Sequence, residues 1–293
     1  MDLFFQLIVN GIVLGSEYAL LGISWGIIFN TTGTFHFAHG VVYTAGAYGA
    51  VLFADTLGLP LPLAVAGGIA VAVVLGVGID VVCYQPMRRI QATPMTILIA
   101  SLGVLIVVEN TMPILFGTAS RTLPGIDTYP IAVGSAVITN LNLLKVVVTW
   151  GLFAALIAFL RYTRAGKALR AVGSNPEMAQ TVGFHLRRVY YLAFGIGSAL
   201  AGVGGILTVA DTGAVPHMGT QAVLIASMAV LLGGMGKIVG SALGGFFIGM
   251  TMSLSILALP SEWQLTLAFG LLVVVIALRP RGFLGGKVTK AEV

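Results

Sequence analysis

The 293-residue sequence has few charged residues: only 9% of its residues are Asp, Glu, Lys or Arg, while 58% are hydrophobic. Soluble domains carry about 25% charged residues, because their surfaces face water. So little charge is not enough to cover a water-exposed surface of this size, and an ordinary soluble fold is excluded. The composition predicts a single membrane domain over residues 1–293.

Cysteine is also nearly absent. Cys83 is the single cysteine, so no disulfide within the chain is possible, and a small apolar filler is its usual role. The first residues, Met1-Asp2-Leu3-Phe4, lack the basic segment that opens a cleaved secretory signal. We therefore expect the first apolar stretch to stay in the protein as a membrane helix.

The motifs of common enzymes are missing. The one Gly-x-Ser-x-Gly match, Gly22-Ile23-Ser24-Trp25-Gly26, lies inside an apolar run and not between a strand and a helix, and the Gly-Lys pairs lack the flanking residues of a phosphate-binding loop. His36 and His39 stand three residues apart, which is not the spacing of a helical zinc motif, and Glu17 lies elsewhere. We therefore predict no catalytic residue, no metal site and no cofactor in this chain, and any ATP would have to be hydrolysed by a partner.

Apolar segments run nearly from end to end, and a membrane helix needs about 20 such residues. Eight segments meet this requirement, and a ninth, 221–232, is apolar but short. The eight are 3–29, 38–57, 61–84, 95–116, 143–160, 189–210, 238–258 and 263–278. The sequence thus predicts an all-α polytopic fold with eight or nine transmembrane helices.

The formal net charge of +5 comes from basic residues gathered in short segments between the spans. This is the positive-inside pattern of membrane topology, and it argues against a nucleic-acid partner. With the basic segments in the cytoplasm, only Arg121 and Lys145 of the basic residues fall outside. An odd number of nine spans fits best, with the N-terminus periplasmic and the C-terminus, which carries Lys287 and Lys290, cytoplasmic.

Two connecting segments are long. Residues 117–142 are expected in the periplasm, with turn signals at Leu123-Pro124-Gly125 and Tyr129-Pro130. Residues 161–188 are expected in the cytoplasm, with one helix over 167–172 and a second over 177–182. Asn175 fits the cap of the second helix, and Pro176 fits its first position, where a missing N–H is harmless. The pattern predicts two short helices on the membrane surface.

Three acidic residues lie within the predicted spans, where charges are costly and often functional. Asp80 stands close enough to Arg88 to predict an interfacial ion pair. Glu17 lies in the middle of the first span, and Glu109 lies deep in the fourth. For these two, a structural carboxylate and a residue lining a substrate path remain equally open.

Three more polar residues are candidates for the same path. Asn110 follows Glu109 directly, and His36 and His39 flank a turn at the inner end of the first helical hairpin. We favour a structural role for the two imidazoles, as hydrogen-bond partners of backbone groups that a helix break exposes. The candidate translocation path is therefore Glu17, His36, His39, Glu109 and Asn110.

Four motifs occur in the order found in one transporter family, and the resemblance covers nearly the whole chain. They are Phe35-His36-Phe37-Ala38-His39-Gly40, Tyr84-Gln85-Pro86-Met87-Arg88, Thr163-Arg164-Ala165-Gly166-Lys167-Ala168-Leu169-Arg170-Ala171 followed by Asn175-Pro176-Glu177, and Gly233-Gly234-Met235-Gly236-Lys237-Ile238-Val239-Gly240. The sequence resembles the permease subunits of branched-chain amino-acid ABC importers, specifically the shorter, LivH-like type. His36 and Gln85 depart from the asparagine and arginine that are usual in this family.

The resemblance implies a type II importer fold in the bacterial inner membrane. It implies a second homologous permease subunit, two cytoplasmic ATPase subunits and a periplasmic substrate-binding protein as partners. Segment 161–188 then becomes the loop that couples the permease to the ATPases. Its candidate coupling residues are Arg164, Gly166, Lys167, Arg170, Asn175, Pro176, Glu177 and Gly183.

The implied function is ATP-driven import of branched-chain or other hydrophobic amino acids. Glu17 and Glu109 stand where this family more often has uncharged residues, so a permease for urea, short amides or another small polar or aromatic acid is the alternative. A stand-alone proton-coupled transporter that uses the same two carboxylates belongs to another class. An enzyme is disfavoured, because the sequence offers no nucleophile–base pair.

Overall fold

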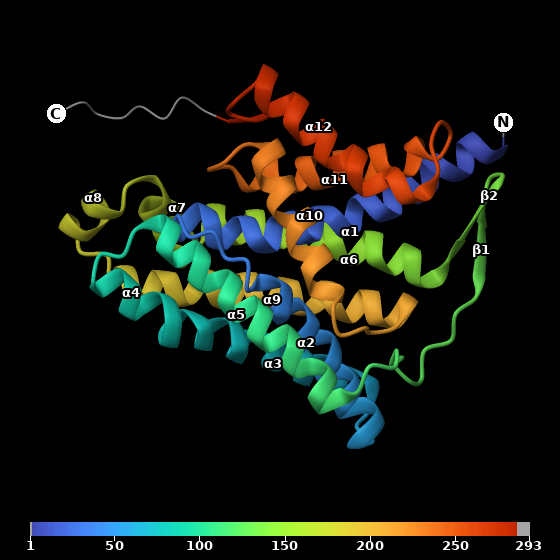
Figure 1. Ribbon diagram of the computed structural model, residues 1–293, viewed down its shortest axis with the longest axis horizontal. Coiled ribbons are helices and arrows are strands. Elements are labelled where there is room, and N and C mark those ends of the chain that lie inside the picture. Colours follow the sequence, from blue (N-terminus) through green and yellow to red (C-terminus); the bar gives the residue numbers. More distant parts are fainter. Residues whose placement is uncertain (1, 286–293) are drawn as a thin grey trace.

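The computed structural model describes residues 2–285, so Lys287 and Lys290 lie outside the described residues (Figure 1). The chain is mostly helical. Its helices are α1 (Asp2–Thr32), α2 (His39–Val51) with a π-helical extension (Leu52–Thr56), α3 (Leu61–Ile79) continuing through a π-helical turn (Asp80–Tyr84) into α4 (Gln85–Arg89), α5 (Pro94–Phe116), α6 (Asn140–Tyr162), α7 (Arg164–Ser174), α8 (Pro176–Thr181), α9 (Leu186–Thr212), α10 (Met218–Gly233), α11 (Ile238–Ser255) and α12 (Gln264–Leu278), which follows a 3-10 turn (Ser261–Trp263).

Within residues 2–285, seven helical stretches are long and apolar enough to cross a membrane. The predicted span 38–57 forms α2 with its π-helical extension, and the short segment 221–232 forms α10, which has 16 residues. A helix of that length extends about 24 Å, which is shorter than the roughly 30 Å hydrocarbon core of a bilayer. The structure therefore contains seven long helices and two shorter apolar ones.

The long helices run between two distinct ends of the molecule (Figure 1). One end carries the short helices α4, α7 and α8, and we call it the short-helix end. The other carries the start of α1 and a small β-hairpin, and we call it the hairpin end. Helix α10 crosses the other helices steeply in this view.

One hairpin departs from the predicted all-α fold. Strands β1 (Pro130–Val133) and β2 (Ala136–Thr139) pair antiparallel. The two-residue turn between them contains Gly134, whose φ is 63°, and a glycine-containing dipeptide between two β-prone runs is a known hairpin signal. The backbone N–H of Val137 donates to Gln6 of α1 at 2.8 Å, so the hairpin is fixed against the start of the first helix.

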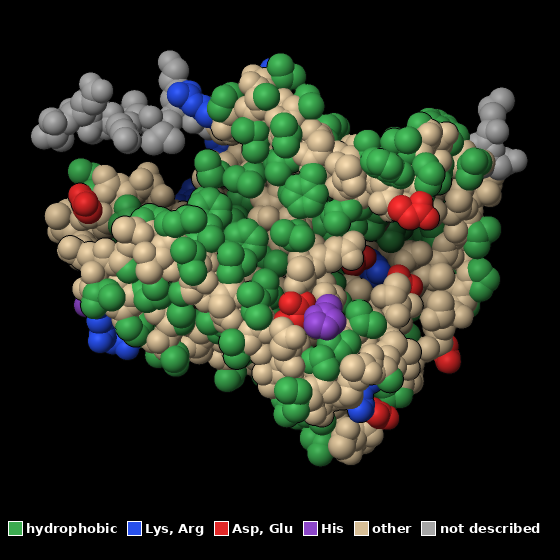
Figure 2. All heavy atoms as spheres, in the orientation of Figure 1, with side chains coloured by type: hydrophobic (Ala, Val, Ile, Leu, Met, Phe, Trp, Pro, Cys, Tyr) green, Lys and Arg blue, Asp and Glu red, His purple; other side chains and the backbone are tan. Residues whose placement is uncertain are grey.

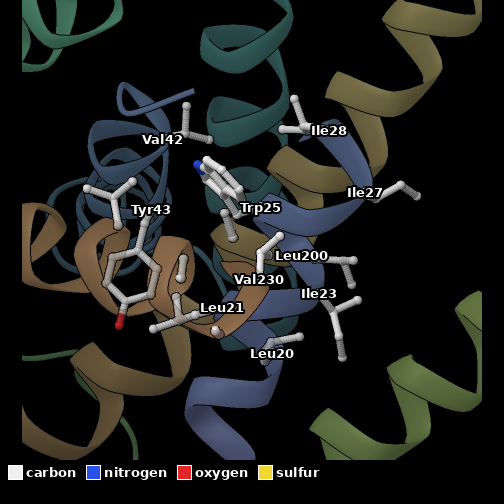
Figure 3. Packing of buried hydrophobic residues seen from close by; sticks show 14 of the residues in the cluster. Leu20, Leu21, Ile23, Trp25, Ile27, Ile28, Val42, Tyr43, Leu200 and Val230 are labelled. Atoms are coloured by element: carbon white, nitrogen blue, oxygen red, sulfur yellow. The ribbon is translucent and has the colours of Figure 1, made fainter. Parts of the chain in front are cut away.

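Helices α1 and α2 form the centre of the bundle. Every residue of α2 is buried, and side chains of α1 point in several directions into the core (Figure 3). Around Trp25 of α1 lie Val42 of α2, Leu200 of α9 and Val230 of α10 (Figure 3). Helix α12, by contrast, is the most exposed of the seven long helices. The apolar surface that would face lipid thus belongs mainly to the outer helices.

Glycine allows two of the central helices to touch backbone to backbone. Gly40 in the first turn of α2 and Gly219 in the first turn of α10 pack so closely that a Cβ on either would collide with the carbonyl oxygen of the other. In a membrane, such close approach replaces the hydrophobic drive that water gives to soluble cores. The first turns of the two shorter helices therefore meet inside the bundle.

Candidate functional site

His36 and His39 lie at the break between α1 and α2, and both are buried. Nδ1 of His36 lies 2.8 Å from the hydroxyl of Tyr84, and Nε2 of His39 lies 3.0 Å from the hydroxyl of Ser24. The indole N–H of Trp25 donates to the carbonyl of His36 at 2.9 Å. The expected bonds from imidazole to exposed backbone are therefore not what the structure shows, because hydroxyl groups partner the rings and the indole partners the backbone.

Glu17 belongs to a buried charge cluster that joins three helices. Nζ of Lys145 on α6 lies 3.0 Å from Oε2 of Glu17 on α1 and 2.8 Å from Oδ2 of Asp211 on α9. The Lys145 side chain is only 5% exposed. The hydroxyl of Thr208 donates to the other oxygen of Glu17 at 2.8 Å, and the hydroxyl of Tyr43 donates to Thr208 at 2.6 Å. One ammonium group is thus shared by two carboxylates.

Sequence reasoning missed Lys145 and Asp211 as members of this cluster. Lys145 was predicted only to lie on the periplasmic side of the membrane, and no prediction covered the burial of its side chain inside the bundle on α6. A lone lysine in an apolar helix was the available signal, because a charge at membrane depth needs a partner. Its partners are 128 and 66 residues away along the chain, so the sequence alone could not name them.

Glu109 on α5 faces a pocket of about 460 Å³. Its Oε1 accepts a hydrogen bond from the hydroxyl of Thr220 at 2.6 Å and lies 3.5 Å from Nδ1 of His217. The pocket is lined by Glu109, His217, Thr220, Gln221, Leu224 and Leu265. Asn110 is not among the lining residues, and its side chain donates to the carbonyl of Ile106 in its own helix.

The face of the molecule shown in Figure 2 is largely hydrophobic, as expected of a membrane protein. Near its centre, a histidine and acidic side chains lie together, beside a hollow in which further acidic and basic side chains are visible (Figure 2). Charged groups in the middle of an apolar face mark functional sites in membrane proteins. This face therefore carries the candidate site of the molecule.

The predicted ion pair of Asp80 is confirmed. Nη2 of Arg88 lies 2.5 Å from Oδ1 of Asp80, and the guanidinium group lies 4.8 Å from the ring centre of Tyr190 on α9. The side-chain amide of Gln85 donates to the hydroxyl of Tyr191 at 3.2 Å. These contacts join α4 to α9 and border a pocket of about 700 Å³ at the short-helix end.

The two short helices predicted in segment 161–188 are present as α7 and α8. Oγ1 of Thr163 accepts from the N–H of Gly166 at 2.9 Å and caps α7. Oδ1 of Asn175 accepts from the N–H of Met178 at 2.9 Å, with Pro176 at the first position of α8. The predicted cap is therefore confirmed. Gly183, with a φ of 94°, lies in the turn after α8.

Helix α7 is fixed to the bundle along one side. Gly166 packs on the backbone of Leu160 at the end of α6, and Gly173 packs on the backbone of Asn30 near the end of α1, with no room for a Cβ at either glycine. Leu169 and Val172 are buried. The charged candidates of the segment are exposed to solvent: Arg164, Lys167, Arg170 and Glu177.

Residues 7–276 match the family described as "Branched-chain amino acid transport system / permease component". The chain belongs to this permease family. The permease is 33% identical to the high-affinity branched-chain amino acid transport system permease protein LivH of Escherichia coli K12, over 96% of both chains. It is 30% identical to the corresponding protein BraD of Pseudomonas aeruginosa, again over 96% of both.

Two more distant similarities are one curated relative and one solved structure. A probable branched-chain amino acid transport permease protein LivH of Methanocaldococcus jannaschii is 27% identical, over 86% of this chain and 82% of the relative. Among solved structures, PsaBC from Streptococcus pneumoniae in complex with Fab aligns over 93% of this chain and 91% of that chain, with 12% identity and a TM-score of 0.49. The permease is a multi-pass membrane transport protein and not an enzyme.

Proposed function

We propose that the permease is the membrane-spanning subunit of an ATP-driven ABC importer for branched-chain or other hydrophobic amino acids in the bacterial inner membrane. The proposal rests on the family and on the relatives, whose names specify branched-chain amino acid transport. A second homologous permease, two cytoplasmic ATPase subunits and a periplasmic binding protein complete the machine. ATP and Mg²⁺ are used by the ATPases.

The two ends of the bundle support an orientation of the permease in the membrane. With the short-helix end in the cytoplasm, Arg88, Arg89 and the basic residues of α7 lie inside, as the positive-inside rule requires. The N-terminus and the hairpin segment 117–142 then lie in the periplasm. Nine crossings, seven by the long helices and two by α2 and α10, give this single domain a cytoplasmic C-terminus and a type II importer arrangement.

The observation that carries the proposal is the close packing of α7, which leads into α8, against the helix bundle. Helix α7 packs on both α1 and α6, so a force applied to it reaches the centre of the bundle. On α8 and just after it, Met178 is 65% exposed and Val182 is 69% exposed. Exposed apolar side chains on a fixed helix at the cytoplasmic surface are suited to docking an ATPase subunit. Segment 161–188 is thus the coupling segment.

The docking role is tested by changing one exposed side chain. Met178→Asp places a charge in the proposed apolar contact, and we expect the ATPase subunits to be lost when the permease is purified from native membranes. Met178→Leu keeps an apolar side chain of similar size and serves as the control. Purification of the wild-type permease without any ATP-binding partner would sink the importer proposal, as would pH-driven transport by the permease alone in liposomes.

The importance of the packing between α7 and α6 is tested by a side chain that forces the two helices apart. Gly166→Trp has no space at the Leu160 backbone, and Pro176→Trp alters the start of α8. We expect ATP-driven uptake in proteoliposomes to fall about tenfold or more while ATP hydrolysis continues. Gly151→Trp places the same side chain on α6 where a Cβ meets no other atom, and should leave uptake unchanged. Normal uptake by both coupling variants would contradict the role.

A further inference from the structure

The Glu109 pocket has the size and position of a ligand site. Its volume of about 460 Å³ falls within the roughly 300–1,000 Å³ that is usual for small-molecule pockets. Three helices contribute to it, because Glu109 belongs to α5, Leu224 to α10 and Leu265 to α12. A pocket between three helices of a permease is suited to bind the transported substrate.

The charge of this pocket is unbalanced. Among residues 2–285, the ion pairs give Glu109 no lysine or arginine partner, and the His217 ring at 3.5 Å is 64% exposed. The Glu109 side chain is itself only 12% exposed. Glu17, in contrast, shares the ammonium group of Lys145 with Asp211. A poorly hydrated carboxylate without a fixed cation suits a ligand that brings its own positive group.

The hydrogen bonds leave part of Glu109 free for such a ligand. Within the described residues, Oε1 accepts the Thr220 bond, whereas no hydrogen bond involves Oε2. Thr220 lies in the first turn of α10, which has no side-chain cap, and the N-terminal end of a helix carries a partial positive charge. The hydroxyl of Thr220 therefore holds one oxygen of the carboxylate in place, and the second oxygen is available.

The remaining lining residues fit the other parts of an amino acid. Gln221 is exposed, and its amide can donate hydrogen bonds to a carboxylate. Leu224 and Leu265 supply apolar surface on the α10 and α12 sides. The pocket thus presents an acceptor for an ammonium group, a donor for a carboxylate and two leucines for an aliphatic chain.

We propose that this pocket is a binding site for a zwitterionic amino acid in the translocation path. Glu109 accepts hydrogen bonds from the α-ammonium group, Gln221 donates to the α-carboxylate, and Leu224 and Leu265 contact the aliphatic side chain. The inference rests on the importer function proposed above and narrows it. Urea and short amides carry no ammonium group, so this binding site selects against them.

The ligand chemistry is tested by competition at the assembled complex of both permeases and the ATPases, without the binding protein. Radiolabelled leucine is displaced by isoamylamine, which keeps the ammonium group and the aliphatic chain, or by 4-methylpentanoate, which keeps the carboxylate and the chain. We expect isoamylamine to compete and 4-methylpentanoate and urea to compete at least about tenfold more weakly. Equal competition by 4-methylpentanoate, or better competition by urea, would overturn the assignment.

Two variants test the residues. Glu109→Gln keeps an acceptor for Thr220 but removes the charge, and leucine affinity should fall at least about tenfold. Leu224→Trp keeps Glu109 but fills the pocket and should also abolish binding, so the test stands even if one variant does not assemble. Asp55→Asn, at an exposed acid at the end of the α2 extension, is the matched control and should bind leucine normally.

Uptake by the wild-type complex separates the two proposals. If the wild type, with its binding protein and ATP, imports no amino acid, the importer function itself fails. If the wild type imports leucine while both the Glu109→Gln and Leu224→Trp variants bind and import it normally, the importer stands and the pocket assignment is overturned. Import by the wild type with weakened binding in both variants is the expected result.

Discussion

Glu17 and Glu109 are the same kind of residue in the same kind of apolar helix, yet their surroundings differ. Glu17 shares the buried ammonium group of Lys145 with Asp211, at distances of 3.0 and 2.8 Å. Glu109 faces a pocket, and the only nitrogen that the ion pairs of residues 2–285 place beside it belongs to the exposed ring of His217. One carboxylate has a lysine of the protein as its partner, and the other is left for a ligand.

The difference teaches that depth in a membrane helix does not decide what an acidic residue does. A buried ion costs several kcal/mol unless a partner and hydrogen bonds offset that cost. In the Glu17 cluster the offset comes from α6 and α9, so the cluster also ties three helices together. In the Glu109 pocket a hydroxyl group and a helix end give partial compensation. We therefore expect the first site to govern stability and the second to govern binding.

The largest expected effect comes from removing the shared cation. Lys145→Met leaves Glu17 and Asp211 close together without a positive charge between them. Breaking a buried ion pair in this way costs about 3–5 kcal/mol. Thermal unfolding of the purified permease in detergent, followed by circular dichroism, should show a marked fall in the midpoint temperature.

The same variant offers its own control. Adding Glu17→Gln to Lys145→Met removes one of the stranded charges, so the double variant should recover part of the lost stability. An unchanged unfolding midpoint in the Lys145→Met variant would contradict a stabilising role for the Glu17 cluster. So would a double variant whose loss equals the sum of two separate losses.

A smaller effect is expected from removing one acid of the cluster. Asp211→Asn leaves the pair of Lys145 and Glu17 intact and keeps an oxygen that accepts from the lysine. Because a hydrogen bond to a charged group contributes about 1.5–3 kcal/mol and Asp211 is 23% exposed, we expect a loss of about 1.5 kcal/mol or less. The same unfolding measurement checks it, and a loss as large as that of Lys145→Met would show that Asp211, not Glu17, is the main partner.

The smallest effect on stability is expected at the second site. Glu109→Gln still accepts from Thr220, so unfolding should change by less than about 1 kcal/mol, although leucine binding falls. The contrast between the two carboxylates holds if changes in the Glu17 cluster lower stability and a change at Glu109 lowers leucine binding. A stability loss at Glu109 that matches that of Lys145→Met would erase the distinction between the two carboxylates.

Much of the fold follows from local features of the sequence. The predicted segment 95–116 is α5 (Pro94–Phe116), and 238–258 begins with α11 at Ile238. Asn175 and Pro176 start α8 as predicted, because a cap and a first-turn proline act within a few residues. The hairpin at 130–139 was missed although its Gly134-Ser135 turn is a local signal, because the apolar strands were read as part of a loop.

The candidate site was predictable only in part. Glu17 and Glu109 stood out as acids in apolar spans, but Asn110 bonds its own helix and does not line the pocket with Glu109. His217 and Thr220 gave no signal of their own, because they lie more than a hundred residues from Glu109 and become its neighbours only where the start of α10 reaches α5. Histidine and threonine are common enough that no pattern marked them.

The sequence by itself determined the class of protein, the position of most membrane helices and the cap of α8. Those features depend on the length of apolar runs and on hydrogen bonds between residues a few positions apart. Only the tertiary structure decided that Lys145 pairs with Glu17 and Asp211, that Gly40 meets Gly219, and that Glu109 faces a pocket. Such pairings join residues far apart in the chain, and they are fixed by how helices pack, which no local pattern records.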